Sequence, residues 1–391
     1  MKGRNNVKIS VTFKIISAML VVFVIPFQVI LKKPLMKGTI DFITWIQHRR
    51  THSGIYFFEL FQYFGDGTLL NVVGPIIYNF LHPKRSSVII ISSTIVHFFG
   101  NFFGTLLQEE RPFWYSSKVR PELCSKGYGN PSMTILITAT FMPMLFIELF
   151  HKHKYRWVGY SLLIFIILMG SISRVYLGGS FPHQVIITLF LAFSFVTLYF
   201  SLNKDISKLC FNSCYGYYKN RMYLVKWVIF SFALMILEGI IELVIYVTPS
   251  NYAKIISNAV THCDVNYNPN GKYNLQNSLE IFFGVGFAFG CMLSSKYLSI
   301  YWITTEWWKR IFRAILASGI NFGIIVGFNY ISTDNFFSEV VVHHIVPNFL
   351  CGFLFTGFMP FALYKTSLIG RIKPIVDTEH AISKFEDKAI I

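Results

Sequence analysis

The stretch "SLLIFIILMGSISRVYLGGSFPHQVIITLFLAFSFVTLYF" occupies residues 161–200 and decides the fold. Two long apolar runs flank a short polar turn, which carries Arg174 and His183. Each run approaches the length of about 20 apolar residues that a helix needs to cross a bilayer. Ionisable side chains at the end of such a run are costly to bury, so they indicate a partner or a function. The stretch therefore predicts two membrane helices joined by a turn with a chemical role.

The same apolar pattern recurs along the whole chain of 391 residues, which is 53% hydrophobic and only 14% charged. A soluble protein of this length would have about 25% charged residues. The sequence predicts an all-α polytopic membrane protein with about ten transmembrane helices. We expect them at about 15–31, 67–81, 87–107, 133–150, 157–173, 184–201, 225–248, 278–297, 311–331 and 345–364. The first is expected to be a retained signal anchor; it carries a lysine at its edge and the second is short, so nine spans is the alternative.

The net charge of +16 predicts topology rather than nucleic-acid binding. With ten spans, 23 of the 35 lysines and arginines fall on the side of the two termini and 12 on the other side. Cytoplasmic loops carry the excess of basic residues, so both termini are expected in the cytoplasm. The loops around 32–66, 108–132, 174–183, 249–277 and 332–344 then face the lumen or the outside. We expect membrane lipids, rather than nucleic acid, as partners.

Three short polar stretches fall on this lumenal face: "QEERPFW" (108–114), "YGNPSMT" (128–134) and "SRVYLGGSFPHQV" (173–185). They place Arg111 and Arg174 at membrane depth on the same side. Two guanidinium groups beside the start of a helix form a plausible clamp for a phosphate, which they bind bidentately. The alternative is a salt bridge from either arginine to Glu109 or Glu110.

These stretches resemble the signature of the membrane phosphatase superfamily that contains type 2 phosphatidic acid phosphatases, sphingosine-phosphate phosphatases and glucose-6-phosphatase. That signature runs K-x6-R-P, then P-S-G-H, then S-R-x5-H. The matching residues, in chain order, are Arg111, Pro112, Pro131, Ser132, Ser173 and Arg174. "YFGDG" (63–67) is also similar to a sequence in these lipid phosphatases, and "FPHQV" (181–185) looks most like the glucose-6-phosphatase branch. The resemblance covers about residues 55–200 and implies a six-helix phosphatase-like core with a lumenal site.

The chain departs from this signature where the chemistry lies. The resemblance implies one histidine that attacks phosphorus, a second that serves as acid and base, and a lysine and two arginines that hold the phosphoryl oxygens. The attacking position is Ser180 here, the acid–base position is Thr134, the motif glycine is Met133 and the lysine position is Gly104. Both arginines and Ser132 remain, so the sequence predicts a phosphate-binding clamp of Arg111, Ser132 and Arg174 without the family's catalytic groups.

A substitute catalyst is conceivable only around His183, either as the base for Ser180 or as a nucleophile itself, displaced from the motif position. Ser180 has His183 three residues on, and a serine needs a base within hydrogen-bond reach to become a nucleophile. His183 is instead expected to be a helix-start residue bonded to backbone or water. Thr134 does not titrate near neutral pH, as a histidine does.

The sequence thus leaves three functions open. The leading one is a catalytically impaired member of the superfamily, a pseudo-phosphatase that binds a phosphate-bearing lipid or other ligand, or a membrane scaffold. The second is an active lumenal phosphomonoester hydrolase of lipid phosphate or sugar phosphate. The third is a transporter that uses Glu238 and Glu242, which are four residues apart and so share one helix face. None of them implies a cofactor or a metal.

Four segments organise the chain: 1–54 with the signal anchor and a lumenal loop, the core at 55–201, a four-helix extension at 202–364 and a cytoplasmic tail at 365–391. We expect the protein in the endoplasmic reticulum or another endomembrane. Cys124 and Cys263 both fall on the lumenal side, where a disulfide is chemically permitted, and their pairing stays open.

Overall fold

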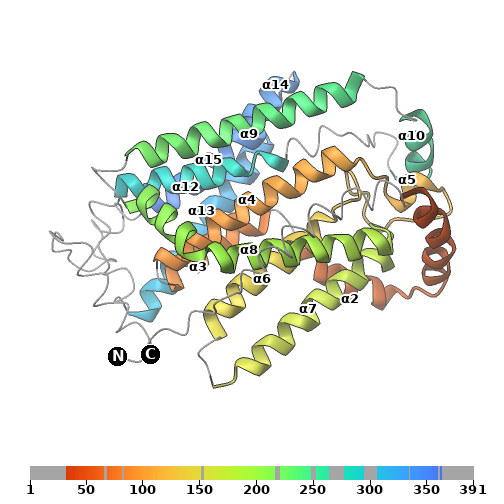
Figure 1. Ribbon diagram of the computed structural model, residues 1–391, viewed down its shortest axis with the longest axis horizontal. Coiled ribbons are helices and arrows are strands. Elements are labelled where there is room, and N and C mark those ends of the chain that lie inside the picture. Colours follow the sequence, from red (N-terminus) through yellow and green to blue (C-terminus); the bar gives the residue numbers. More distant parts are fainter. Residues whose placement is uncertain are drawn as a thin grey trace. The chain divides into compact units, whose positions relative to one another are not determined.

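The computed structural model describes residues 32–65, 68–81, 83–150, 154–215, 221–247, 252–263, 277–294, 306–333, 335–359 and 362. All regular structure in these residues is helical (Figure 1). Among the described residues, six helices are long and apolar enough to cross a membrane: Arg85–Tyr115, Met133–Phe150, Arg156–Tyr176, Pro182–Ser201, Trp307–Asn329 and Val340–Phe358. The chain is therefore an all-α polytopic membrane protein, as the sequence predicts.

Within the predicted spans 67–81 and 278–297 the described residues form the shorter apolar helices Leu70–Phe80 and Ile281–Ser294. Residues 67 and 295–297 of these spans lie outside the described residues. The predicted span 225–248 is part of α9 (Arg221–Val247). The first predicted span, 15–31, lies outside the described residues. The choice between ten and nine spans thus stays a prediction.

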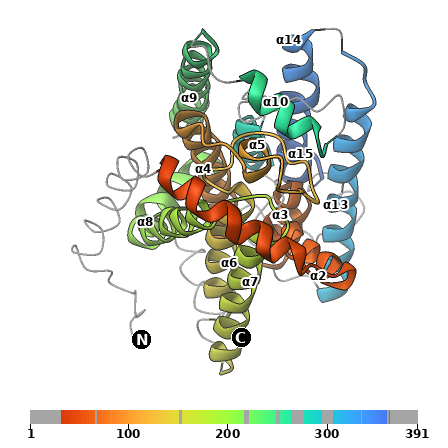
Figure 2. The same ribbon diagram turned by 90° about the vertical axis from the view of Figure 1, so that its right-hand side faces the viewer.

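The segment 32–66, which the sequence led us to treat as a loop, is largely helical. Residues 32–48 form one helix and α2 (His52–Gln62) a second. The side chain of Thr51 caps α2, since its Oγ1 accepts a hydrogen bond from the backbone N–H of Gly54 at 3.1 Å. Figures 1 and 2 show helix 32–48 lying across one end of α6 (Met133–Phe150), α7 (Arg156–Tyr176) and α8 (Pro182–Tyr215) rather than along them.

The chain divides into two compact units. Unit 1 comprises the described parts of Met1–Gly67, Ile95–Asn203 and Met235–Ser278. One of its apolar clusters joins helix 32–48 to α5 (Pro112–Tyr115), to the start of α8 and to α10 (Tyr252–Val260). The buried members are Met36, Ile40, Ile43, Phe113, Trp114, Val119, Phe181 and Ala259. Helix 32–48 thus buries positions one turn apart, which is why a segment with three lysines still folds against the core.

A disulfide joins Cys124 to Cys263 in unit 1, with the two Cα atoms 5.9 Å apart. The sequence left this pairing open. Beside the bond, the side chain of Asn258 donates to the carbonyl oxygens of Trp114 and Tyr115 at 2.9 and 3.2 Å. The long loop between α5 and α6 is thereby fixed to α10.

Unit 2 comprises the described parts of Thr68–Thr94, Lys204–Leu234 and Leu279–Ile391. Its helices α12 (Ile281–Ser294) and α15 (Val346–Phe353) approach closely through glycines. A Cβ atom on Gly286 would lie 2.1 Å from the carbonyl oxygen of Phe349, and one on Gly352 would lie 2.2 Å from that of Phe283. Small residues that let backbones meet are typical of packing between membrane helices.

Helix α13 (Trp307–Asn329) contacts α3 (Thr68–Phe80) through polar side chains in the same unit. Asn321 donates to the carbonyl oxygen of Asn71 at 2.8 Å, and Ser318 to that of Val72 at 2.8 Å. Hydrogen bonds of this kind join helices that lipid would otherwise separate.

Candidate functional site

The turn between α7 and α8 places the arginine and the histidine of the third motif. Gly178 has a φ of +76°, a conformation that favours glycine, and its N–H bonds the carbonyl oxygen of Val175. α8 then begins at Pro182, and the side chain of Gln184 accepts a hydrogen bond from the N–H of Phe181 at 2.9 Å. Because both helix ends are fixed in this way, Arg174 and His183 have defined positions.

Arg174 lies at the end of α7 and is buried, with 4% of its surface exposed. Its Nη1 donates to Oε1 of Gln62, the last residue of α2, at 3.1 Å. Its Nε is buried and has no hydrogen-bond partner among the described residues. No carboxylate of the described residues forms an ion pair with Arg174. The salt bridge to Glu109 or Glu110 that the sequence offered as an alternative is therefore not formed by Arg174.

Arg111 precedes α5 and is held by backbone oxygens. Its Nε, Nη1 and Nη2 donate to the carbonyls of Gly127, Gly179 and Lys126 at 2.8, 2.9 and 3.0 Å. The side chain thus connects the loop before α6 to the turn before α8. Three of its five N–H groups serve this connection, so Arg111 has a structural task beside any ligand.

The two arginines meet at one glycine. Arg111 donates to the carbonyl oxygen of Gly179, while a Cβ atom on Gly179 would lie 2.8 Å from Cζ of Arg174. The guanidinium of Arg174 therefore packs directly on the backbone of this residue. A glycine is needed here because a side chain would displace the arginine.

Ser132 and Ser180 face each other beside the arginines, with 3.2 Å between their Oγ atoms. The N–H of Ser180 bonds the carbonyl oxygen of Arg174 at 3.1 Å, and that of Ser132 bonds Oγ1 of Thr188 at 2.9 Å. The hydroxyl at the attacking position is thus engaged by the hydroxyl of the second motif. Arg111, Ser132, Arg174 and Ser180 all lie in one neighbourhood of unit 1.

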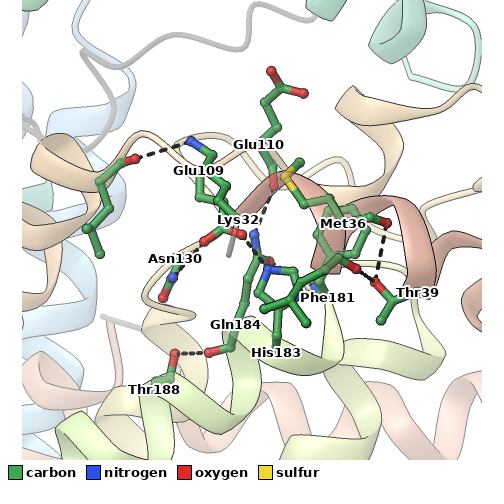
Figure 3. A network of polar contacts seen from close by, with 12 residues as sticks. Lys32, Met36, Thr39, Glu109, Glu110, Asn130, Phe181, His183, Gln184 and Thr188 are labelled. Atoms are coloured by element: carbon green, nitrogen blue, oxygen red, sulfur yellow. Dashed lines mark hydrogen bonds and ion pairs between the residues drawn. The ribbon is translucent and has the colours of Figure 1, made fainter. Parts of the chain in front are cut away.

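His183 bonds a carboxylate that the sequence did not assign to it. Its Nε2 contacts Oε1 of Glu109, which is fully buried, and Asn130 donates to Oε2 of Glu109 at 2.7 Å (Figure 3). The ring stacks on Phe181 with centroids 5.3 Å apart, and Nδ1 is buried with no hydrogen-bond partner in the described ranges. Our expectation that His183 bonds backbone or water is wrong. Since the two residues are 74 positions apart, spacing gave no signal for the pair.

Ser180 and His183 do not form a nucleophile–base pair, because the hydroxyl bonds Ser132 and the imidazole bonds Glu109. The other positions of the motifs are also built into the packing. Met133 and Thr134 open α6, and a Cβ atom on Gly100 would lie 2.7 Å from Sδ of Met133. The backbone of Gly65, from "YFGDG", approaches Thr134 so closely that a Cβ atom would lie 1.9 Å from its carbonyl oxygen.

A lysine from helix 32–48 lies near the carboxylates. Nζ of Lys32 donates to the carbonyl oxygens of Gln108 and Leu107 at 2.8 and 3.4 Å. These carbonyls lie at the C-terminal end of α4 (Pro83–Leu107). Burial lowers the pKa of Lys32 below its ordinary value of 10.5, and Glu109 and Glu110 offset part of this. Gly104, at the lysine position of the first motif, is buried in the last turn of α4.

The glutamates of α9 are described in part. Glu238 is fully buried and its Oε1 accepts a hydrogen bond from Ser278 at 2.6 Å, whereas the side chain of Glu242 lies outside the described residues. Within the described ranges, no group of three or more His, Cys, Asp or Glu side chains is placed to hold a metal ion.

Residues 86–208 match the family model of the PAP2 superfamily. This segment begins near the start of α4 and ends within α8, and it contains all three motif stretches. The match supports a phosphatase-like fold for these residues. It also supports membership in the PAP2 superfamily over residues 86–208 of the chain. No curated protein and no solved structure matches it significantly.

Proposed function

We propose that the chain is a catalytically impaired member of the PAP2 superfamily that binds a phosphate-bearing ligand, a membrane lipid above all, through Arg111, Ser132 and Arg174. The observation that carries this proposal is Arg174, a buried cation whose Nε has no partner among the residues that the structure describes and whose side-chain partner, Gln62, is neutral. A buried charge is costly unless it is paired. An anionic ligand supplies the missing partner.

The chemistry of the family requires a nucleophile and an acid or base. Neither Ser180 nor Thr134 titrates near neutral pH, and the Oγ of Ser180 bonds Ser132 rather than a base. A single general acid–base group contributes about 10²–10⁴-fold to a rate, so two such losses leave little turnover. Binding of the ligand, or scaffolding of other membrane proteins in the ligand-bound state, is then the function.

The site faces the lumen of an endomembrane such as the endoplasmic reticulum, and both termini are cytoplasmic. Basic residues support this orientation, since 23 of 35 fall on the side of the termini. The disulfide between Cys124 and Cys263 supports it independently, because disulfides persist in oxidising compartments and are rare in the cytosol.

A second candidate function is hydrolysis of a lipid or sugar phosphate, and the contact between His183 and Glu109 favours it. A buried carboxylate that holds one ring nitrogen orients the imidazole and leaves the other nitrogen, here Nδ1, for a proton or a phosphoryl group. In this candidate mechanism His183 is the single general base: Nδ1 takes the proton of an attacking water and returns it to the leaving alkoxide. The contact is compatible with binding alone, so it ranks second.

The test uses the purified full-length protein in detergent or in vesicles. We expect wild type to bind inorganic phosphate or orthovanadate, seen as a rise in melting temperature, and the Arg174→Ala variant to lose this response. Wild type should hydrolyse phosphatidic acid, sphingosine phosphate and glucose 6-phosphate no faster than Arg174→Ala. Turnover that depends on both Arg174 and His183 would establish the hydrolase and end the impaired-enzyme proposal.

A further inference from the structure

We propose that Gln62 is a further ligand-binding residue, whose side-chain amide donates to the same phosphate as Arg174. This inference rests on the proposed function and names a contact from α2, which precedes the segment 86–208 that carries the family match. The ligand class is an oxyanion with at least two free oxygens, such as a phosphate monoester.

The orientation of Gln62 follows from its bond to the arginine. Its Oε1 accepts from Nη1 of Arg174 at 3.1 Å, so its amide oxygen is turned to the guanidinium. Its Nε2 is buried and has no hydrogen-bond partner among the described residues. Nε of Arg174 is in the same condition. Two buried donors on directly bonded side chains are thus without an acceptor.

The chemistry of these atoms selects an anion. An arginine has N–H donors and no acceptor, and the NH₂ group of an amide only donates. A water molecule could accept from either, but it would leave the positive charge of Arg174 unbalanced. A phosphate oxygen accepts such bonds and brings the opposite charge, and bonds of this kind are the strong ones.

The framework holds Gln62 in place without a ligand. Oγ of Ser173 donates to the carbonyl oxygen of Phe58 at 2.7 Å, and the hydroxyl of Tyr176 accepts from the N–H of Thr51 at 3.3 Å. The rings of Phe58 and Tyr176 are 4.5 Å apart. These contacts fix α2 to the last turn of α7, which carries Arg174. The side-chain amide of Gln62 therefore needs little rearrangement to bind the phosphate.

The sharpest test is Gln62→Glu, which keeps the shape and replaces the donor by a carboxylate. The new carboxylate should pair with Arg174 and take the place of the ligand. We expect the ligand-free variant to melt at a higher temperature than wild type and to show no shift with inorganic phosphate. Gln62→Met, which removes the donor without adding a charge, should weaken phosphate binding by about tenfold, the value of one hydrogen bond.

Gln47→Glu is the matched control, because Gln47 belongs to helix 32–48 and bonds the backbone of Arg120 instead of the site. It should bind phosphate as wild type does. Phosphate-induced shifts that survive in both Gln62→Glu and Gln62→Met, but not in Arg174→Ala, would overturn the role of Gln62 and leave the proposed function standing. Absence of any shift in wild type would overturn both. Should Gln62→Glu fail to fold, Gln62→Met decides alone.

Discussion

Arg174 and His183 are both buried in unit 1, yet the groups that face them differ in charge. His183 bonds the carboxylate of Glu109, which Asn130 also contacts. Arg174 has only the neutral Gln62, and its Nε has no partner in the described part of the chain. His183 therefore contacts a carboxylate of the chain, whereas the anion that would face Arg174 is the proposed ligand. A missing counter-charge, rather than burial alone, indicates where a ligand binds.

The largest effect is expected from restoring the family's groups on the Arg174 side. The combined variant Gly104→Lys, Met133→Gly, Thr134→His and Ser180→His should acquire hydrolysis of phosphatidic acid at least about 100-fold above wild type, as expected for general acid–base groups. Single restorations should do little, because catalytic residues act as a unit. The control adds Arg174→Ala and should return to background. Equal rates with and without Arg174 would mean that this side holds no phosphoryl group.

Loss of the Glu109 carboxylate, which contacts His183 and Asn130, should lower the stability of the protein and leave ligand binding unchanged. Glu109→Ala leaves Asn130 and His183 without their partner, and breaking a buried pair costs about 3–5 kcal/mol of unfolding free energy. Chemical denaturation in detergent would measure this, while the phosphate-induced shift should persist.

Glu122→Ala is the matched control for that experiment. Glu122 pairs with Arg50 at 2.9 Å; the side chain of Arg50 is 8% exposed, but that of Glu122 is 29% exposed, so water screens the carboxylate. Pairs of this kind contribute about 0–1 kcal/mol. If Glu109→Ala lowers the unfolding free energy no more than Glu122→Ala does, the contact between Glu109 and His183 contributes little stability. The contrast with Arg174 then fails.

The sequence predicted the helical class, the apolar runs and the neighbourhood of the motifs, because these depend on local composition and spacing. It could not predict Glu109 with His183 or Gln62 with Arg174, since the two members of each pair are distant in the chain. The helix at 32–48 was missed for another reason. It lies between two predicted spans and was assigned to the loop that joins them, and only the spacing of Met36, Ile40 and Ile43 marks a buried face.

A smaller effect is expected from the glycine on which the two arginines meet. Gly179→Ala would place a Cβ atom 2.8 Å from Cζ of Arg174, so the guanidinium must shift. Misplacement of a binding group by about 1 Å can cost up to a hundredfold, and a flexible arginine should recover part of it. We expect phosphate binding to weaken by about tenfold in a titration followed by melting temperature. Unchanged affinity would show that the ligand does not depend on this position of Arg174.

The smallest effect concerns Lys32, which bonds the backbone carbonyls at the C-terminal end of α4 and lies near Glu109. A lysine at a helix C-terminus contributes about 0.3–1 kcal/mol, so Lys32→Met should lower the stability slightly at neutral pH.

Burial depresses the pKa of Lys32 in the folded protein, which means that the unfolded chain binds its proton more tightly. The stability due to Lys32 is therefore present in full above its unfolded pKa and falls as the pH drops through the folded pKa. Melting temperatures of wild type and Lys32→Met at pH 7 and pH 10 should diverge further at pH 10, in favour of wild type. Convergence at pH 10 would mean that the carboxylates of Glu109 and Glu110, rather than burial, determine the pKa of Lys32. Lys32 would then stabilise these carboxylates together with His183.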